Sequence, residues 1–279
     1  MSSDIMTQRK LVVTEISATS QELGVETGQI GQDPRPTESR HSQPAVEQLE
    51  TGAHDSEMVI FALAQAVEQR DPHIAGHCER LAFMSVALGT AMRLDSASLM
   101  ALYRGGYLHD IGKVAMPDSI LFKPAGLTPD EWRLMRCHTI RGEGICRHMQ
   151  ALAPVLPIIR HHHEKWDGSG YPDGLRGSRI PLLARILQVV DIYDALTCER
   201  PYKPALSPAQ SLRIMEEETE RGWRDPEIMA LFLRLHREIT SKLPDFAACT
   251  DATSASLRNM QHSLVAQVAC APAVCKYNA

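Results

Sequence analysis

Helical spacing of apolar residues runs through the middle of this chain, and it restricts the fold more than any other feature. Apolar side chains recur three or four residues apart at 59–67 and again at 81–92. The sequence contains no clear alternation of apolar and polar residues, which would indicate strands, and no internal repeat. It therefore predicts an all-α domain, a helical bundle with functional loops at one end.

Sequence signals for helix starts support this prediction. Thr128–Glu131 has the pattern of a capping box with proline at the first helical position, and Ser207–Gln210 repeats that pattern. Asp225–Glu227 is a third expected start. Two segments, 111–127 and 166–181, are instead rich in glycine and proline, so we expect long ordered loops there.

Composition changes at both ends of the chain suggest its domain organisation. Residues 1–52 are poor in large apolar groups and contain a Pro-rich stretch, which predicts a flexible leader or linker. Residues 246–279 are rich in small and polar residues, which predicts a poorly ordered tail with at most a weak helix. We therefore expect one folded domain, the part of the chain that carries the function, to cover residues 53–245.

Charge and cysteine content exclude several classes of protein. A formal net charge of -5 argues against a basic surface for a polynucleotide partner. No apolar run approaches the ~18 residues of a membrane span, and no signal peptide is evident. The 7 cysteines form no CxxC pair and are odd in number, which favours a reducing compartment. These features predict a cytoplasmic location.

Histidine is abundant, with 12 residues in the chain, and much of it lies in segments that also carry carboxylates. Within the first of these segments, His73 and His77 are four residues apart and would share one face of a helix. The five segments with candidate ligands are Asp71–His77, Leu108–Lys113, His138, His161–Glu164 and Val189–Asp194.

Imidazole and carboxylate ligands together suit zinc, manganese and iron, and the absence of cysteine from these segments argues against a structural zinc finger. The set is too large for one ion, and Asp110 could bridge two. A site with two or three metal ions is therefore the economical interpretation, and paired metals suit phosphodiester cleavage.

Each segment also has an ordinary structural interpretation. His138 or His148 alone could be a surface or core histidine, and His161–His163 could be a solvated run. Asp191 could bond a neighbouring backbone amide. The combination favours metal binding, because Asp110 and Asp191 both stand in apolar surroundings where an unpaired carboxylate is costly.

Two longer motifs resemble those of the HD-GYP family, whose fold is a helical bundle of the HD-domain type with long ordered loops around a metal site. His109–Lys113 followed by Pro117–Leu121 resembles the extended HD motif, and His162–Pro172 resembles the GYP segment. The match continues through Arg185–Asp191, Asp194–Leu196 and Arg200–Lys203, and covers about residues 55–236.

The resemblance implies hydrolysis of cyclic di-GMP by a metal-activated bridging hydroxide, with pGpG as the product and GMP as the alternative end product. It implies two or three divalent ions, iron or manganese first, with zinc, nickel and cobalt as alternatives. The implied ligands are His77, His109, Asp110, His138, His162, His163 and Asp191.

Other roles also come from the resemblance. Lys113 would act with Asp110 in catalysis and contact a phosphate, and Arg200 and Lys203 would hold the rest of the dinucleotide. The loop Gly170-Tyr171-Pro172 would dock GGDEF-type domain proteins.

Two departures from the family pattern stand out. His73 occupies a position where some members carry a glutamate that binds a third metal, so both its role and the third ion stay open. Arg224-Asp225-Pro226 replaces a common Phe-Asp-Pro, a change that concerns local packing rather than the metal site.

Alternatives remain at this point. The domain could be a catalytically weak module that senses cyclic di-GMP or binds a partner. It could also hydrolyse a mononucleotide or a mixed cyclic dinucleotide. A helix from about Val46 to Arg70 could pair two chains in a homodimer.

Overall fold

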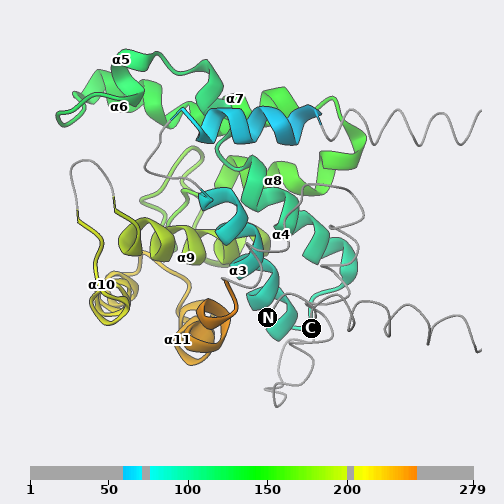
Figure 1. Ribbon diagram of the computed structural model, residues 1–279, viewed down its shortest axis with the longest axis vertical. Coiled ribbons are helices and arrows are strands. Elements are labelled where there is room, and N and C mark those ends of the chain that lie inside the picture. Colours follow the sequence, from blue (N-terminus) through cyan, green and yellow to red (C-terminus); the bar gives the residue numbers. More distant parts are fainter. Residues whose placement is uncertain (1–58, 71–75, 200–203, 244–279) are drawn as a thin grey trace, which may run out of the picture. The chain divides into compact units, whose positions relative to one another are not determined.

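A computed structural model describes residues 59–70, 76–199 and 204–243 (Figure 1). Contacts divide the chain into a unit of residues 1–46 and a unit of residues 47–279, and all described residues belong to the second. The predicted leader and tail lie outside the described residues, as do His73, Arg200 and Lys203.

Helices dominate the described residues, and none of these residues is in a strand, which confirms the all-α prediction. A first helical segment covers residues 59–68. The elements that follow are α3 (His77–Ala91), α4 (Ser96–Leu108), η1 (Ile111–Ala115), α5 (Asp118–Leu121), α6 (Pro129–Arg136), α7 (His138–Cys146), η2 (Gln150–Val155), α8 (Leu156–His161), η3 (Gly177–Arg179), α9 (Leu182–Thr197), α10 (Pro208–Glu220) and α11 (Pro226–Ser241), where η denotes a 3-10 helix.

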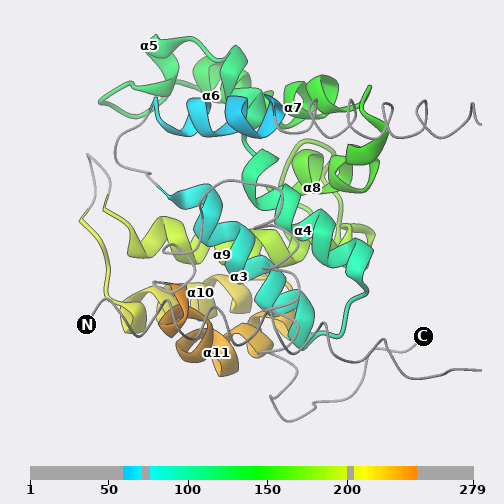
Figure 2. The same cartoon turned by 45° about the vertical axis from the view of Figure 1, so that its right-hand side comes forward.

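Helix α3 forms the centre of the core. It packs against α4, α9 and α11, and Figures 1 and 2 show it between α4 and α9. Its side chains Leu81, Met84 and Leu88 are almost completely buried. Because burying a side chain of this size contributes about 1.5–3 kcal/mol, this helix anchors the elements that carry the site. A helix that is apolar around most of its surface has to be buried in this way.

The three predicted helix starts are confirmed. Thr128 and Glu131 form a reciprocal capping box at the start of α6, and Ser207 and Gln210 form one at the start of α10. At α11, the side chain of Asp225 accepts hydrogen bonds from the first backbone amides of the helix. These caps satisfy amide groups that have no partner inside the helix.

The prediction of long loops at 111–127 and 166–181 is wrong in part. The first segment contains η1 and α5, and the second contains η3. Pro117 precedes the first turn of α5, where Asp118 adds a favourable negative charge, so this start carries a signal that the glycine and proline content obscured. Short helical turns also satisfy backbone groups close to the packed core.

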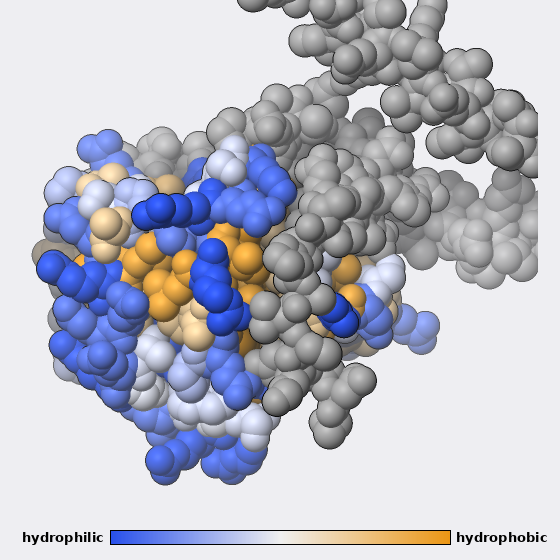
Figure 3. Space-filling model, turned by 90° about the horizontal axis from the view of Figure 1, so that it is seen from below, coloured by the Kyte–Doolittle hydropathy of each residue, from blue (hydrophilic) through white to orange (hydrophobic). Residues whose placement is uncertain are grey.

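Figure 3 shows the side of the molecule on which α10 and α11 lie, with apolar side chains gathered between polar ones. A groove of about 640 Å³ between these helices is lined by Leu212, Leu233 and His236, among others. No candidate ligand is among its lining residues, so the groove is separate from the site described below. No described helix is long and apolar enough to cross a membrane.

Candidate metal centre

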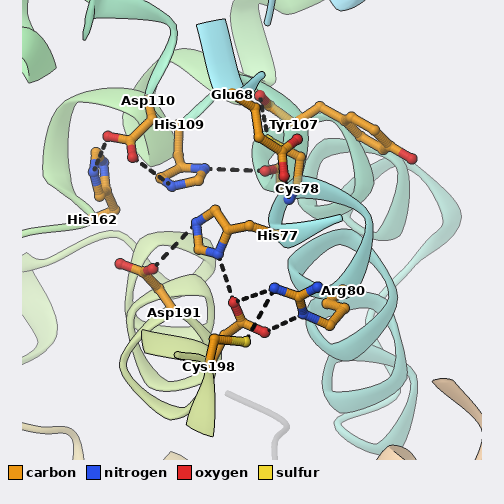
Figure 4. A network of polar contacts seen from close by, with 12 residues as sticks. Glu68, His77, Cys78, Arg80, Tyr107, His109, Asp110, His162, Asp191 and Cys198 are labelled. Carbon is orange, nitrogen blue, oxygen red and sulfur yellow. Dashed lines mark hydrogen bonds and ion pairs between the residues drawn. The ribbon is translucent and has the colours of Figure 1, made fainter. Parts of the chain in front are cut away.

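Residues from five elements converge beside the core. His77 begins α3, His109 and Asp110 follow α4, and Asp191 lies within α9, and in Figure 4 these side chains point toward one another. The structure brings seven of the eight candidate ligands together in two groups, and the eighth, His73, lies outside the described residues. The first group is His77, His109 and Asp191, and the second is Asp110, His138, His162 and His163.

In the first group, Nε2 of His77 lies 3.6 Å from Oδ1 of Asp191. The rings of His77 and His109 are 5.4 Å apart between centroids. Nε2 of His109 is 3.3 Å from Oδ2 of Asp110, so this carboxylate also reaches the first group. An ion held here would have two imidazole nitrogens and carboxylate oxygens around it.

In the second group, histidine rings lie near the other carboxylate oxygen of Asp110. Oδ1 of Asp110 lies 3.2 Å from Nε2 of His138 and 3.9 Å from Nε2 of His162. The two Nε2 atoms are 3.4 Å apart. Asp110 therefore stands between the groups with one oxygen toward each, as a ligand shared by two ions would.

The hydrogen bonds of the imidazole rings define their tautomers. Nδ1 of His109 lies 3.0 Å from the carbonyl oxygen of Gly106. Nδ1 of His138 lies 2.7 Å from the carbonyl oxygen of Met135, and Nδ1 of His162 lies 2.9 Å from that of Ile159. A carbonyl only accepts, so each Nδ1 carries the proton and, in the neutral ring, each Nε2 presents a lone pair.

These lone pairs need a cation. The Nε2 atoms of His138 and His162 face each other as two acceptors, and Nε2 of His109 and Oδ1 of Asp110 are buried without a hydrogen-bond partner. Buried polar atoms without partners are rare and costly, and divalent ions would satisfy all of them. The donor set therefore fits a pair of metal ions.

Electrostatics keeps three of these ligands, Asp110, His162 and His163, in the states that bind metal. Burial, together with the neighbouring histidines, holds the pKa of His162 and His163 well below the ordinary value. Burial alone would raise the pKa of Asp110, but the Lys113 ammonium at 2.5 Å and His109 outweigh it and hold that pKa well below its usual range. Neutral imidazole and ionised carboxylate are the ligand forms that metals require.

Asp194 holds His77 in place, a role that the sequence did not indicate. Its Oδ2 accepts from Nδ1 of His77 at 2.7 Å, and its Oδ1 accepts from Nε of Arg80 at 2.5 Å. Although burial acts to raise it, these bonds lower the pKa of Asp194 to about 2. Asp191 and Asp194 are three residues apart on α9, so helical spacing places both carboxylates on one face but does not indicate which histidine they meet.

We expect Asp194→Asn to weaken metal binding by about 10–100-fold, because the amide cannot hold His77 and Arg80 as the carboxylate does. Competition with a fluorescent chelator measures this affinity. Asp130→Asn, an exposed substitution on α6, serves as the control and should leave it unchanged. Equal affinities in the two variants would contradict this role of Asp194.

A third acidic group, His161, Glu164 and Asp173, fastens the loop that follows α8. Both carboxylate oxygens of the buried Glu164 are used, accepting from the amide of Asp173 at 2.7 Å and that of Leu175 at 3.1 Å. The Asp173 carboxylate is bound by Arg160 at 2.7 and 2.8 Å. These bonds explain the cluster without a metal ion.

The loop turns back over the second group of ligands. A Cβ at Gly170 would lie 2.2 Å from the backbone nitrogen of Lys165, so only glycine allows the two backbone segments to come this close. The next residue, Tyr171, donates its amide to the His163 carbonyl at 3.2 Å. The ring of Tyr171 lies 4.8 Å from that of His163, so the predicted GYP loop covers one of the candidate ligands.

A cavity of about 280 Å³ opens beside the two groups. Its lining includes His77, Asp110, Lys113, His163 and Asp191. The predicted catalytic pair, Asp110 and Lys113, therefore faces the same space as ligands from both groups. A small anionic substrate in this cavity would meet the metal ions and the Lys113 ammonium together.

The chain is similar to several known proteins. The model of the HD domain family matches residues 62–228. A 3'3'-cGAMP-specific phosphodiesterase of Vibrio cholerae is 35% identical over 189 residues, which are 68% of this chain and 40% of the relative. A cyclic di-GMP phosphodiesterase of Thermotoga maritima is 36% identical over 186 residues, 65% of this chain and 50% of the relative.

Among solved structures, a cyclic GMP-AMP specific phosphodiesterase of V. cholerae matches with a TM-score of 0.54 at 19% identity. The match covers 76% of this chain and 58% of that one, and it supports the fold. The chain spans half or less of the length of the two curated relatives above.

Proposed function

This chain belongs to the HD domain family, and on that premise we propose that it is a metal-dependent phosphodiesterase that hydrolyses cyclic di-GMP to pGpG. The observation that carries the proposal is the convergence of imidazole Nε2 atoms from both ligand groups on the two oxygens of Asp110. Phosphodiester hydrolysis is the reaction that paired divalent ions serve especially well.

The proposed cofactors are two divalent ions, which the residues of the first and second groups would hold, with Asp110 available to both groups. Iron and manganese suit the mixed imidazole and carboxylate ligands, and zinc, nickel and cobalt are alternatives. Such ions would supply an activated water and hold the scissile phosphate. A third ion would require a further ligand, the role proposed for His73.

The other catalytic and binding roles would belong to side chains of the protein. Lys113, whose ammonium lies 2.5 Å from Asp110 at the cavity, would hold a phosphate oxygen and give a proton to the leaving oxygen. The buried His109 and His138 would fix the ligand geometry through their bonds to backbone carbonyls. Arg200 and Lys203 are proposed to bind the second phosphate, since a dianionic substrate needs cations beyond the metal ions.

The cellular location and the binding partners of the protein are also proposals. The unpaired cysteine pattern supports a cytoplasmic location. The Gly170-Tyr171-Pro172 loop is proposed to dock GGDEF-type domains, and the stretch before Arg70 to pair two chains. A mixed cyclic dinucleotide is the second candidate substrate, because the V. cholerae relative carries that specificity in its name.

The direct test loads the purified chain with iron or manganese without oxygen and follows cyclic di-GMP by chromatography. We expect pGpG to form with the loaded protein, to stop after chelation and to resume on reloading. Binding of cyclic di-GMP by the fully loaded protein without any product would favour a sensing module instead. Preferential hydrolysis of a mononucleotide would overturn the proposed substrate.

A further inference from the structure

Arg136, the last residue of α6, lies close to two aromatic rings. Its guanidinium carbon lies 5.2 Å from the centroid of the Tyr171 ring and 5.9 Å from that of Trp132. Arg136 is exposed and forms no ion pair within the described part of the chain. Ring contacts of this kind orient a guanidinium while leaving its N–H groups available.

This arginine is connected to the metal centre through Tyr171. The Tyr171 and His163 rings are 4.8 Å apart and inclined by 31°, so His163, Tyr171, Arg136 and Trp132 form a continuous row. The distance from the Arg136 guanidinium to the His163 ring is therefore at most the sum of the Arg136–Tyr171 and Tyr171–His163 distances. That span is comparable with the reach from a nucleotide phosphate to the far edge of its own base.

The row ends in a surface suited to a nucleobase. Trp132 is 46% exposed, and an exposed indole ring offers a face on which a base can stack. The guanidinium fork matches the O6 and N7 acceptors of guanine, whereas adenine presents a donor where guanine has O6. An arginine at this place can therefore separate guanine from adenine.

From these contacts we propose that Arg136 recognises a guanine base of the cyclic dinucleotide, with Trp132 as the stacking platform. The proposal rests on the proposed function and deepens it by naming a residue that determines base specificity. Neither the metal ligands nor Lys113 supplies that discrimination, because they act on phosphate.

The position of Arg136 at the end of a helix gives a weaker explanation for its charge. A cation in the last turn stabilises a helix dipole, and Arg133 on the same helix already occupies that turn. Arg133 is 77% exposed and pairs with Asp130, with no aromatic contact among the described residues. It is therefore the matched control for Arg136.

The test compares wild type, Arg136→Ala, Arg136→Lys and Arg133→Ala on cyclic di-GMP, 3'3'-cGAMP and cyclic di-AMP. We expect Arg136→Ala to lower kcat/KM for cyclic di-GMP by about 10-fold or more and to change cyclic di-AMP far less. Arg136→Lys keeps the charge and loses the fork, so it should lose the same preference. Arg133→Ala should match wild type.

Two further measurements make the outcome decisive. Metal content per chain should stay unchanged in Arg136→Ala, which separates base recognition from damage to the neighbouring His138. If the wild type hydrolyses none of the three dinucleotides, the proposed function fails, and dissociation constants from calorimetry then give the preference ratio. Equal loss on all substrates, an unchanged ratio, or no binding by the wild type would overturn the role of Arg136.

Discussion

Asp110→Ala is expected to abolish turnover, lowering kcat on cyclic di-GMP by ~10³-fold or more. Loss of a single preorganised hydrogen-bond donor already costs about 10²–10³ in rate, and this carboxylate has an oxygen toward each ligand group. Its removal also takes away the anion that offsets the Lys113 ammonium. Steady-state kinetics measures the loss, and elemental analysis should find fewer metal ions per chain.

Asp118→Ala is the matched control for this prediction. Asp118 lies eight positions later in α5, is 75% exposed at its side chain and pairs with Arg70 rather than with any candidate ligand. Its variant should keep turnover near that of wild type. Hydrolysis at the wild-type rate by a metal-reconstituted Asp110→Ala protein would refute the proposed mechanism.

Gly112→Ala is expected to destabilise the fold by about 3 kcal/mol or more, the upper end of what overpacking costs. An added Cβ would lie 1.9 Å from the carbonyl oxygen of His138 and 2.6 Å from the Gly142 nitrogen. Both are backbone atoms, so neither can rotate away as a side chain would. In the variant, η1 has to move away from α7, and Asp110 then moves away from His138. Urea unfolding of the metal-free protein measures the change in free energy.

Gly144→Ala provides the contrast within α7. An added Cβ there meets no atom within 4 Å, and alanine is the better helix former. This variant should gain about 0.5–1 kcal/mol in free energy of unfolding. If both alanine variants unfold at the same urea concentration as wild type, the close approach of η1 and α7 would be wrong.

Some features of the fold follow from short stretches of sequence. The starts of α6, α10 and α11 were predictable because a capping residue and a proline act within one helical turn. The helices η1 and α5 were not, because a high content of glycine and proline does not distinguish loops from short turns. Glycine is required at position 112 because the His138 carbonyl oxygen of α7 occupies the space of a side chain there.

The same division applies to the site. The sequence, with the resemblance that it carries, determined the fold class and identified seven ligand candidates that the structure places in two groups. Only the tertiary structure decided that Asp110 faces both groups, that Asp194 holds His77, and that Arg136 lies against Tyr171. The physical reason is distance along the chain. A cap or a spaced motif is local, whereas His77 and Asp194 are 117 positions apart and meet only because α3 and α9 pack together.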